Sequence, residues 1–159
     1  MLGDPGFENG TNSSPWVVTS SRSPVDVIND SSSEPAHSGS WDAWLDGWGT
    51  TTTDTLSQTV TLPTGCTTYN LSFWLHINTA ETTTTAKYDT LNVQIMNSSG
   101  TVLATLHTYS NLDHNTSYAQ RTFSLSAYAG QTITLKFTGK EDFEKQTSFV
   151  IDDTALNVS

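Results

Sequence analysis

The sequence has almost no cysteine, few basic residues and no long hydrophobic run. Cys66 is the one cysteine among 159 residues, so no disulfide can form within the chain. Six Lys and Arg stand against 16 Asp and Glu, which gives a formal net charge of −10. Nucleic acids and anionic membrane surfaces select for basic patches, so this balance argues against both as partners. No apolar segment is long enough to cross a bilayer, and the composition favours a secreted, extracellular module.

Amphipathic helical patterns are also absent, whereas alternation of apolar and polar residues recurs along the chain. It is clearest in four segments, Tyr69–Leu75, Thr90–Met96, Arg121–Leu125 and Gln131–Thr138. Polar turn clusters separate these segments, and Asn97–Gly100 is typical of a hairpin turn. Short strands at this spacing predict an all-β fold, an antiparallel two-sheet jelly-roll sandwich, in which residues 1–159 form a single domain.

The final apolar segment, Gln146–Val158, is expected to be a strand with both faces buried. Regular alternation places Ile151 and Leu156 on opposite faces. Asp152 and Asp153 follow the apolar run directly, and a carboxylate at the edge of a core costs free energy unless a cation meets it. Because basic side chains are scarce, a bound metal ion is the better candidate.

A matching acidic segment, Asp4–Gly10, lies at the other end of the chain, with its carboxylates between turn residues. We expect the first and last strands to lie side by side with a calcium ion between them, since calcium prefers hard oxygen ligands. The alternative is that these carboxylates are solvated or hydrogen-bonded.

Several short motifs occur in the order found in one known family. They are Gly6–Gly10, Trp16, Ala36–Gly39 and Phe149–Asp153. In this order they resemble the β-jelly-roll carbohydrate-binding modules of the galactose-binding-like type, which accompany secreted glycoside hydrolases and peptidases. The middle of the chain, with Leu71–His76 and Thr138–Asp142, is similar to a narrower group, the C-terminal accessory domains of secreted bacterial peptidases of the sedolisin type.

The resemblance implies a structural calcium ion that joins the terminal strands. Its ligands, carried over to this sequence, are Glu8, Asp152 and Asp153, with backbone carbonyls near Ser38 and Ser40. Asp4 departs from the family pattern, in which Asn is usual, and either adds charge to the site or caps the turn.

Three of the five tryptophans fall within Ser40–Gly49. Trp41 is expected to be buried, Trp44 to point the other way, and Trp48 to lie in a loop. Sugars lay their C–H faces on aromatic rings while carboxylates and amides contact the hydroxyls. The predicted ligand-binding residues are Trp44, Trp48, Trp74, Asp46, Asn70 and Gln94. The alternative is that some of these rings only cover the mouth of the sandwich.

A second polar group surrounds the long loop after the Leu71–His76 segment. Its members are His76, Asn78, Glu81, Asp89, Glu141 and Asp142. Their spacing matches no compact ion-binding loop, so a second cation and a purely hydrogen-bonded loop remain open alternatives.

Catalytic motifs are missing: the sequence has no nucleophile elbow, zinc-binding His pair, phosphate loop or Cys–His pairing. An acidic pair such as Asp113 and Glu141 is present, but nothing in the sequence places it across a cleft. We therefore do not expect an enzyme.

These observations predict a non-catalytic, calcium-stabilised carbohydrate-binding module of a secreted bacterial enzyme, covalently linked to a catalytic domain and targeting it to polysaccharide. No signal peptide is visible, so secretion requires the sequence to be a mature fragment of a longer precursor. The alternative is a peptidase-associated C-terminal domain that binds protein or stabilises its neighbour without binding glycan. A surface adhesin is a third class, which the absence of an anchor or repeat disfavours.

Overall fold

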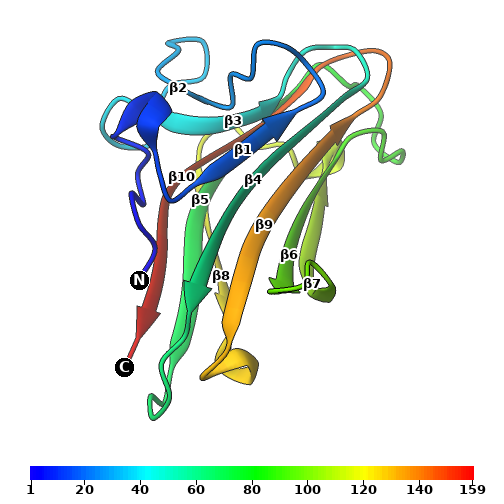
Figure 1. Cartoon of the computed structure of the whole chain (residues 1–159). Helices are drawn as coiled ribbons and strands as arrows, with labels where there is room; N and C mark the ends of the chain where they lie inside the picture. The colour runs from blue at the N-terminus through cyan, green and yellow to red at the C-terminus, as the bar shows by residue number, and fades with distance from the viewer.

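The computed structural model describes all residues, 1–159, and shows ten strands in two five-stranded sheets (Figure 1). The first sheet has the order β1-β4-β9-β6-β7, with strands β1 (Val17–Ser20), β4 (Thr52–Thr61), β9 (Thr132–Glu141), β6 (Thr90–Asn97) and β7 (Val102–Ser110). The second has the order β2-β3-β10-β5-β8, with strands β2 (Ile28–Asn29), β3 (Asp42–Asp46), β10 (Thr147–Val158), β5 (Tyr69–Thr79) and β8 (Ala119–Ser124).

All strand pairs are antiparallel, and the chain crosses repeatedly from one sheet to the other, which confirms the predicted two-sheet sandwich. The only helical segments are three single 3₁₀ turns, η1 (Gly10–Asn12), η2 (Asn111–Asp113) and η3 (Ser126–Tyr128). None of the helical segments is long and apolar enough to span a membrane. The predicted hairpin turn is present between β6 and β7, where the Asn97 amide donates to the Thr101 carbonyl at 2.9 Å.

The core lies between the sheets because alternate residues of each strand point inward. On β5 these are Leu71, Phe73 and Leu75, and each is fully buried. Phe73 meets Phe137 of β9 edge to face, with ring centroids 5.1 Å apart, so the two sheets interlock at this pair. Such aromatic pairs contribute roughly 0.5–1.5 kcal/mol beyond the area they bury.

The expectation that the first and last strands lie side by side needs correction. The first strand, β1, pairs with β4 in the sheet opposite β10. It is the irregular segment ahead of β1 that lies along β10, where the Thr154 amide donates to the Pro5 carbonyl at 2.9 Å and the Met1 amine to the Leu156 carbonyl at 3.0 Å. The two ends of the chain therefore meet, but the N-terminal end contributes a loop and the C-terminal end contributes the strand β10.

The faces of β10 also differ from the expected alternation. The register of β10 against β5 shifts between Asp152 and Ala155. A β-bulge of this kind adds a residue and exchanges the two faces beyond it. Leu156 is therefore in the same core as Ile151, whereas regular alternation would have placed it on the opposite face.

Candidate functional site

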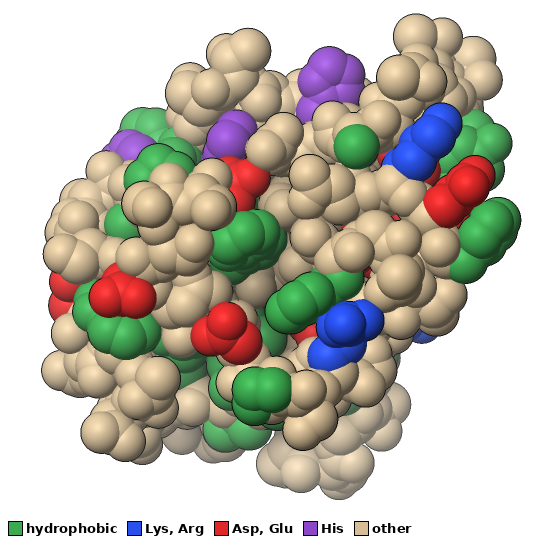
Figure 2. Space-filling view, turned by 90° about the horizontal axis from the view of Figure 1, so that it is seen from above, with side chains coloured by type: hydrophobic (Ala, Val, Ile, Leu, Met, Phe, Trp, Pro, Cys, Tyr) green, Lys and Arg blue, Asp and Glu red, His purple; other side chains and the backbone are tan.

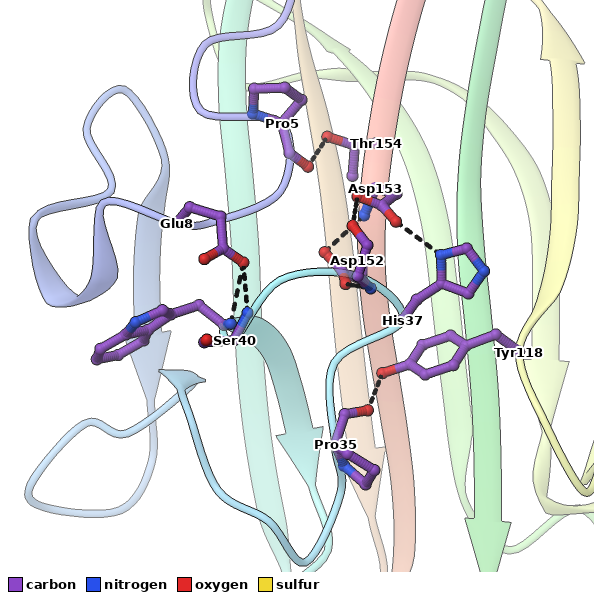
Figure 3. Close-up of polar contacts among 11 residues, drawn as sticks. Pro5, Glu8, Pro35, His37, Ser40, Tyr118, Asp152, Asp153 and Thr154 are labelled. Atoms are coloured by element: carbon purple, nitrogen blue, oxygen red, sulfur yellow. Dashed lines mark hydrogen bonds and ion pairs between the residues drawn. The ribbon is translucent and has the colours of Figure 1, made fainter.

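The predicted calcium residues do lie together, beside the bulge of β10 (Figure 3). A carboxylate oxygen of Glu8 accepts hydrogen bonds from the backbone amides of Ser40, at 2.9 Å, and Trp41, at 3.1 Å. Gly39 allows this contact, because a Cβ there would lie 2.2 Å from the Glu8 carboxylate. We call the group formed by Glu8, Ser38, Ser40, Asp152 and Asp153 the terminal cluster.

The two aspartates of the terminal cluster already have donors. Asp152 accepts from the backbone amides of Ser38, at 3.0 Å, and Asp153, at 2.7 Å. Asp153 accepts from the Ser38 hydroxyl at 2.8 Å and lies 2.6 Å from Nδ1 of His37. Burial raises the pKa of Asp152 to about 6, although the amides of Ser38 and Asp153 oppose the shift.

The acidic side chains of the terminal cluster are close without converging on one point. The one group of three acidic side chains whose oxygens all lie within 4.8 Å of one another is elsewhere in the molecule, at Glu81, Asp89 and Asp142. Asp4 lies just outside the cluster: its carboxylate accepts from the Asn9 amide at 3.3 Å and from the Ser13 hydroxyl. Asp4 therefore caps the N-terminal turn.

The outer face of the second sheet is covered by the loop of residues 30–41. The His37 ring stacks on Trp74 with centroids 4.1 Å apart and an interplanar angle of 15°. The Tyr118 hydroxyl donates to the Pro35 carbonyl at 2.9 Å, which ties the loop down (Figure 3). Trp74 is thus packed beneath the loop instead of forming an open platform.

A buried acidic group lies under this loop, on the second sheet and next to Asp152 of the terminal cluster. Asp42 of β3 is 1% exposed, and one of its oxygens has no hydrogen-bond partner. Burial, followed by the charges of Asp152 and Glu34, raises the pKa of Asp42 to about 8. Glu34 accepts from the Asn78 amide at 2.7 Å and pairs with His76 at 3.4 Å. A proton on Asp42 at neutral pH removes the repulsion between its carboxylate and the charges of Asp152 and Glu34.

Two of the predicted tryptophans meet at a pocket of about 100 Å³. It is lined by Asp26, Asn29, Trp44, Asp46, Gly47 and Trp48. Trp48 is 48% exposed, and the Arg22 guanidinium lies 4.3 Å above its ring. The buried indole N–H of Trp44 has no partner. A Cβ at Gly47 would lie 2.6 Å from that nitrogen, so only glycine fits beside it.

The structure brings together three of the six predicted ligand-binding residues: Trp44, Trp48 and Asp46. Asn70 is exposed near the start of β5, and Gln94 lies on the opposite sheet, where its amide donates to the Thr105 hydroxyl at 3.1 Å. The six residues therefore do not surround one platform.

Sequence reasoning missed Asp26 and Asn29 as pocket residues. They reach the pocket because the short strand β2 pairs with β3, with Asn29 opposite Asp42. A short strand can be predicted in this segment, but the sequence does not specify which strand it pairs with, so the contact was missed.

The second polar group predicted around the long loop separates into two parts. His76 and Asn78 contact Glu34, on the outer face. Glu81, Asp89 and Asp142 converge at one end of the sandwich. Glu141, nearby, accepts from the amides of Trp48 and Gly49 at 3.0 and 2.6 Å, so it holds the turn that carries Trp48.

No protein-family model matches the chain, and no curated protein matches it by sequence. Solved structures do match. TmCBM61, solved in complex with β-1,4-galactotriose, is 22% identical with a TM-score of 0.67, and the match covers 99% of this chain and 97% of that one. The fold is that of the β-sandwich carbohydrate-binding modules.

Two further matches are a xylan-binding CBM22-1 domain of Xyn10C from Paenibacillus barcinonensis and the K3 cleaved adhesin domain of Lys-gingipain from Porphyromonas gingivalis. The first is 14% identical with a TM-score of 0.50 and covers 96% of this chain and 90% of that one. The second is 16% identical with a TM-score of 0.62 and covers 96% of each chain. At these identities the likeness concerns the fold, and it reaches modules of different use.

Proposed function

We propose that the protein is a non-catalytic module that binds polysaccharide, with the Trp44–Trp48 pocket as its contact for a sugar unit. The observation that carries this proposal is the meeting of two indole rings with the polar side chains of Asp26 and Asn29 in one small hollow. Aromatic rings take the C–H face of a sugar, while a carboxylate and an amide at the rim take its hydroxyls.

The details of the pocket suit this ligand. Pockets for drug-sized molecules are commonly ~300–1,000 Å³, whereas this one, at about 100 Å³, suits one sugar unit at most. Arg22 above Trp48 holds that ring in place without covering both of its faces.

The biological setting that we propose is that of an accessory module of a secreted bacterial enzyme. Tethering a catalytic domain to a polysaccharide raises its effective concentration at the substrate. A fold shared with a xylan-binding module and with a module solved in complex with galactotriose supports this setting. The association with sedolisin-type peptidases stays a prediction from the sequence motifs.

A structural calcium at the terminal cluster also belongs to this proposal. Glu8, Asp152 and Asp153 would supply carboxylate oxygens and the Ser38–Ser40 turn would supply carbonyls. The meeting of these residues supports it. The three carboxylates already accept hydrogen bonds from amide and hydroxyl donors, so we expect an ion there to add little stability.

Affinity electrophoresis in gels containing β-1,4-galactan, xylan or a glucan tests the sugar site. We expect at least one polysaccharide to retard the wild-type protein, and Trp48→Ala to abolish the retardation. Tyr88→Ala is the matched control, because it removes another half-exposed aromatic ring, away from the pocket. Equal retardation of wild type and Trp48→Ala, or none on any gel, would contradict the proposal.

The alternative is a domain that binds protein. It is favoured by two exposed rings, Phe143 at 72% and Tyr88 at 53%, on loops that approach one another where the Asp142 amide donates to Asp89. A Phe143→Ala variant that loses a protein partner while no polysaccharide retards the wild type would support this alternative.

A further inference from the structure

The sandwich core becomes acidic at one end, where β4 begins and β9 ends. Strand register places Thr52 opposite Glu141 and Asp54 opposite Gly139. Asp54 and Glu141 are 2% and 3% exposed, and Asp89, beside them, is fully buried. Figure 2 looks onto this end of the molecule, where acidic side chains lie among uncharged ones and basic side chains are few. The inward positions that are apolar elsewhere carry carboxylates here.

Asp46 brings a further carboxylate from the opposite sheet. It is the last residue of β3 and has a left-handed backbone, with φ of 63°. Its amide donates to Asp54 at 2.8 Å, and its side chain reaches across to β9. A Cβ at Gly139 would lie 2.6 Å from an Asp46 oxygen, so the glycine leaves the space that this carboxylate occupies. We call Asp46 and Asp54 the inner pair.

The inner pair lacks partners in a way that its neighbours do not. Both carboxylate oxygens of Asp46 and one of Asp54 are buried without any hydrogen-bond partner. Glu141 instead accepts three backbone amides, and Asp89 accepts the Asp142 amide and the Thr147 hydroxyl. The unsatisfied oxygens therefore belong to two residues that a hydrogen bond joins, from the Asp46 amide to the Asp54 carboxylate.

No basic side chain of the protein neutralises the inner pair. The ion pairs in the structure join His37 to Asp153 and His76 to Glu34, both on the other side of the second sheet. Burying an ionised carboxylate without a partner is strongly unfavourable, because the protein interior does not replace the water that solvates the charge. One proton shared by Asp46 and Asp54 serves two of the three orphan oxygens and leaves the third unsatisfied. A divalent cation serves all three.

We propose that the inner pair holds a divalent cation, calcium by the chemistry of its ligands. Asp46 supplies both carboxylate oxygens and Asp54 supplies one, and calcium accepts such mixed carboxylate binding together with carbonyls or water. The ion ties β3 to β4 across the two sheets, directly before the Gly47–Gly49 turn. Its ligands differ from those of the terminal cluster and from Glu81, Asp89 and Asp142, although Asp89 lies nearby.

Calcium titration of chelator-treated protein, followed by calorimetry and by melting, tests the proposal. We expect Asp46→Asn and Asp54→Asn each to lose one calcium equivalent relative to wild type. At calcium about 100-fold above Kd, the wild-type melting temperature should rise by roughly 5–10 °C. In both variants, the calcium-dependent rise in melting temperature should lack the contribution of an ion at the inner pair. Glu8→Gln and Glu81→Gln, the matched controls for the other two acidic groups, should retain this equivalent.

Two results would overturn the proposal. One is a wild-type protein that binds no calcium; the other is a pair of variants that bind as many equivalents as wild type. If the inner pair is instead protonated and binds no ion, both Asn variants will melt at a higher temperature than wild type, by the same amount in chelator and in calcium. That result would also overturn the proposal. If both variants fail to fold, crystals of wild type grown with calcium decide the matter: an anomalous peak between Asp46 and Asp54 supports the site, and its absence overturns it.

Discussion

The terminal cluster and the inner pair are both acidic, yet their carboxylates are satisfied in different ways. At the terminal cluster a glycine-containing turn presents backbone amides to Glu8 and Asp152, and a histidine reaches Asp153. At the inner pair only Asp46's own amide points at a carboxylate, and three oxygens stay bare. Proximity of acidic groups is therefore a weaker sign of a cation than the absence of donors around them.

Asp42, which lies next to Asp152 of the terminal cluster, is intermediate between the two acidic regions. It has a single orphan oxygen and a pKa raised to about 8, so one proton relieves it without an ion. The number of bare oxygens, compared with what one proton can serve, separates a site that protonates from a site that needs a cation.

The largest expected effect comes from filling the space beside Asp46. Gly139→Ala places a methyl group within 2.6 Å of the carboxylate, inside the core, so we expect a loss of stability of about 1–3 kcal/mol, as for overpacked cores. The calcium-dependent rise in melting temperature should shrink with it.

Gly6→Ala is the control for Gly139→Ala at the terminal cluster. Its Cβ would make an ordinary contact, 3.4 Å from Asp153, so stability should change by under about 1 kcal/mol. Urea unfolding of both variants measures the difference. Equal losses would mean that the inner pair is no tighter than the terminal cluster.

Stability in chelator should fall as pH rises. Burial, followed by the charges of Asp54, Glu141 and Asp89, raises the pKa of Asp46 from 3.8 to about 9, and Asp42 rises to about 8. Because the folded state then binds more protons than the unfolded state, the stability that these two groups contribute is fully present below pH about 4 and is lost progressively up to about pH 9. Urea midpoints at pH 5, 7 and 9 measure this slope.

Calcium should flatten that slope, since an ion at the inner pair replaces the proton. Asp46→Asn should flatten it without calcium, and Asp42→Asn should remove only the part contributed beneath the loop of residues 30–41. A slope that neither calcium nor Asp46→Asn changes would place the pH dependence elsewhere.

A smaller effect is expected where donors are plentiful. Glu8→Gln keeps one carbonyl oxygen for the amides of Ser40 and Trp41 and loses only the charge. In chelator we expect a loss of roughly 1 kcal/mol or less, because hydrogen bonds to charged groups exceed neutral ones by about that amount. Any additional loss that appears only in calcium would measure the ion proposed at the terminal cluster.

The smallest effect should come from Arg22→Ala. It removes an exposed cation–π contact with Trp48, which contributes ~0.5–1 kcal/mol in such settings. We therefore expect stability to fall by no more than about that amount, and polysaccharide affinity to fall a few-fold because the Trp48 ring is held less firmly. Lys136→Ala, on a different sheet from the Trp44–Trp48 pocket, is the charge-matched control and should leave the affinity unchanged.

Much of the fold follows from alternation along the strands. Tyr69–Leu75 and Gln131–Thr138 bury alternate side chains as predicted, and the meeting of Glu8 with the Asp152 region was predicted from motifs at the two chain ends. What the sequence did not reveal depends on local irregularity. The bulge after Asp152, which moves Leu156 into the core, has no signature in the apolar pattern.

The candidate sites were harder to predict because long-range contacts define them. The loop that lays His37 over Trp74 turns a candidate sugar platform into a packed pair. Asp46 was predicted as a sugar contact, but its left-handed backbone aims the carboxylate toward Gly139, inside the sandwich. Neither orientation follows from spacing along the chain.

The comparison between the two acidic regions is tested most directly by counting the calcium ions bound to Asp54→Asn and to Glu8→Gln beside wild type, in one titration series after chelation. We predict one equivalent fewer for Asp54→Asn, with the loss of the associated melting shift, and retention of that equivalent by Glu8→Gln. A result in which Asp54→Asn binds as many calcium ions as wild type, with the same melting shift, would contradict the account.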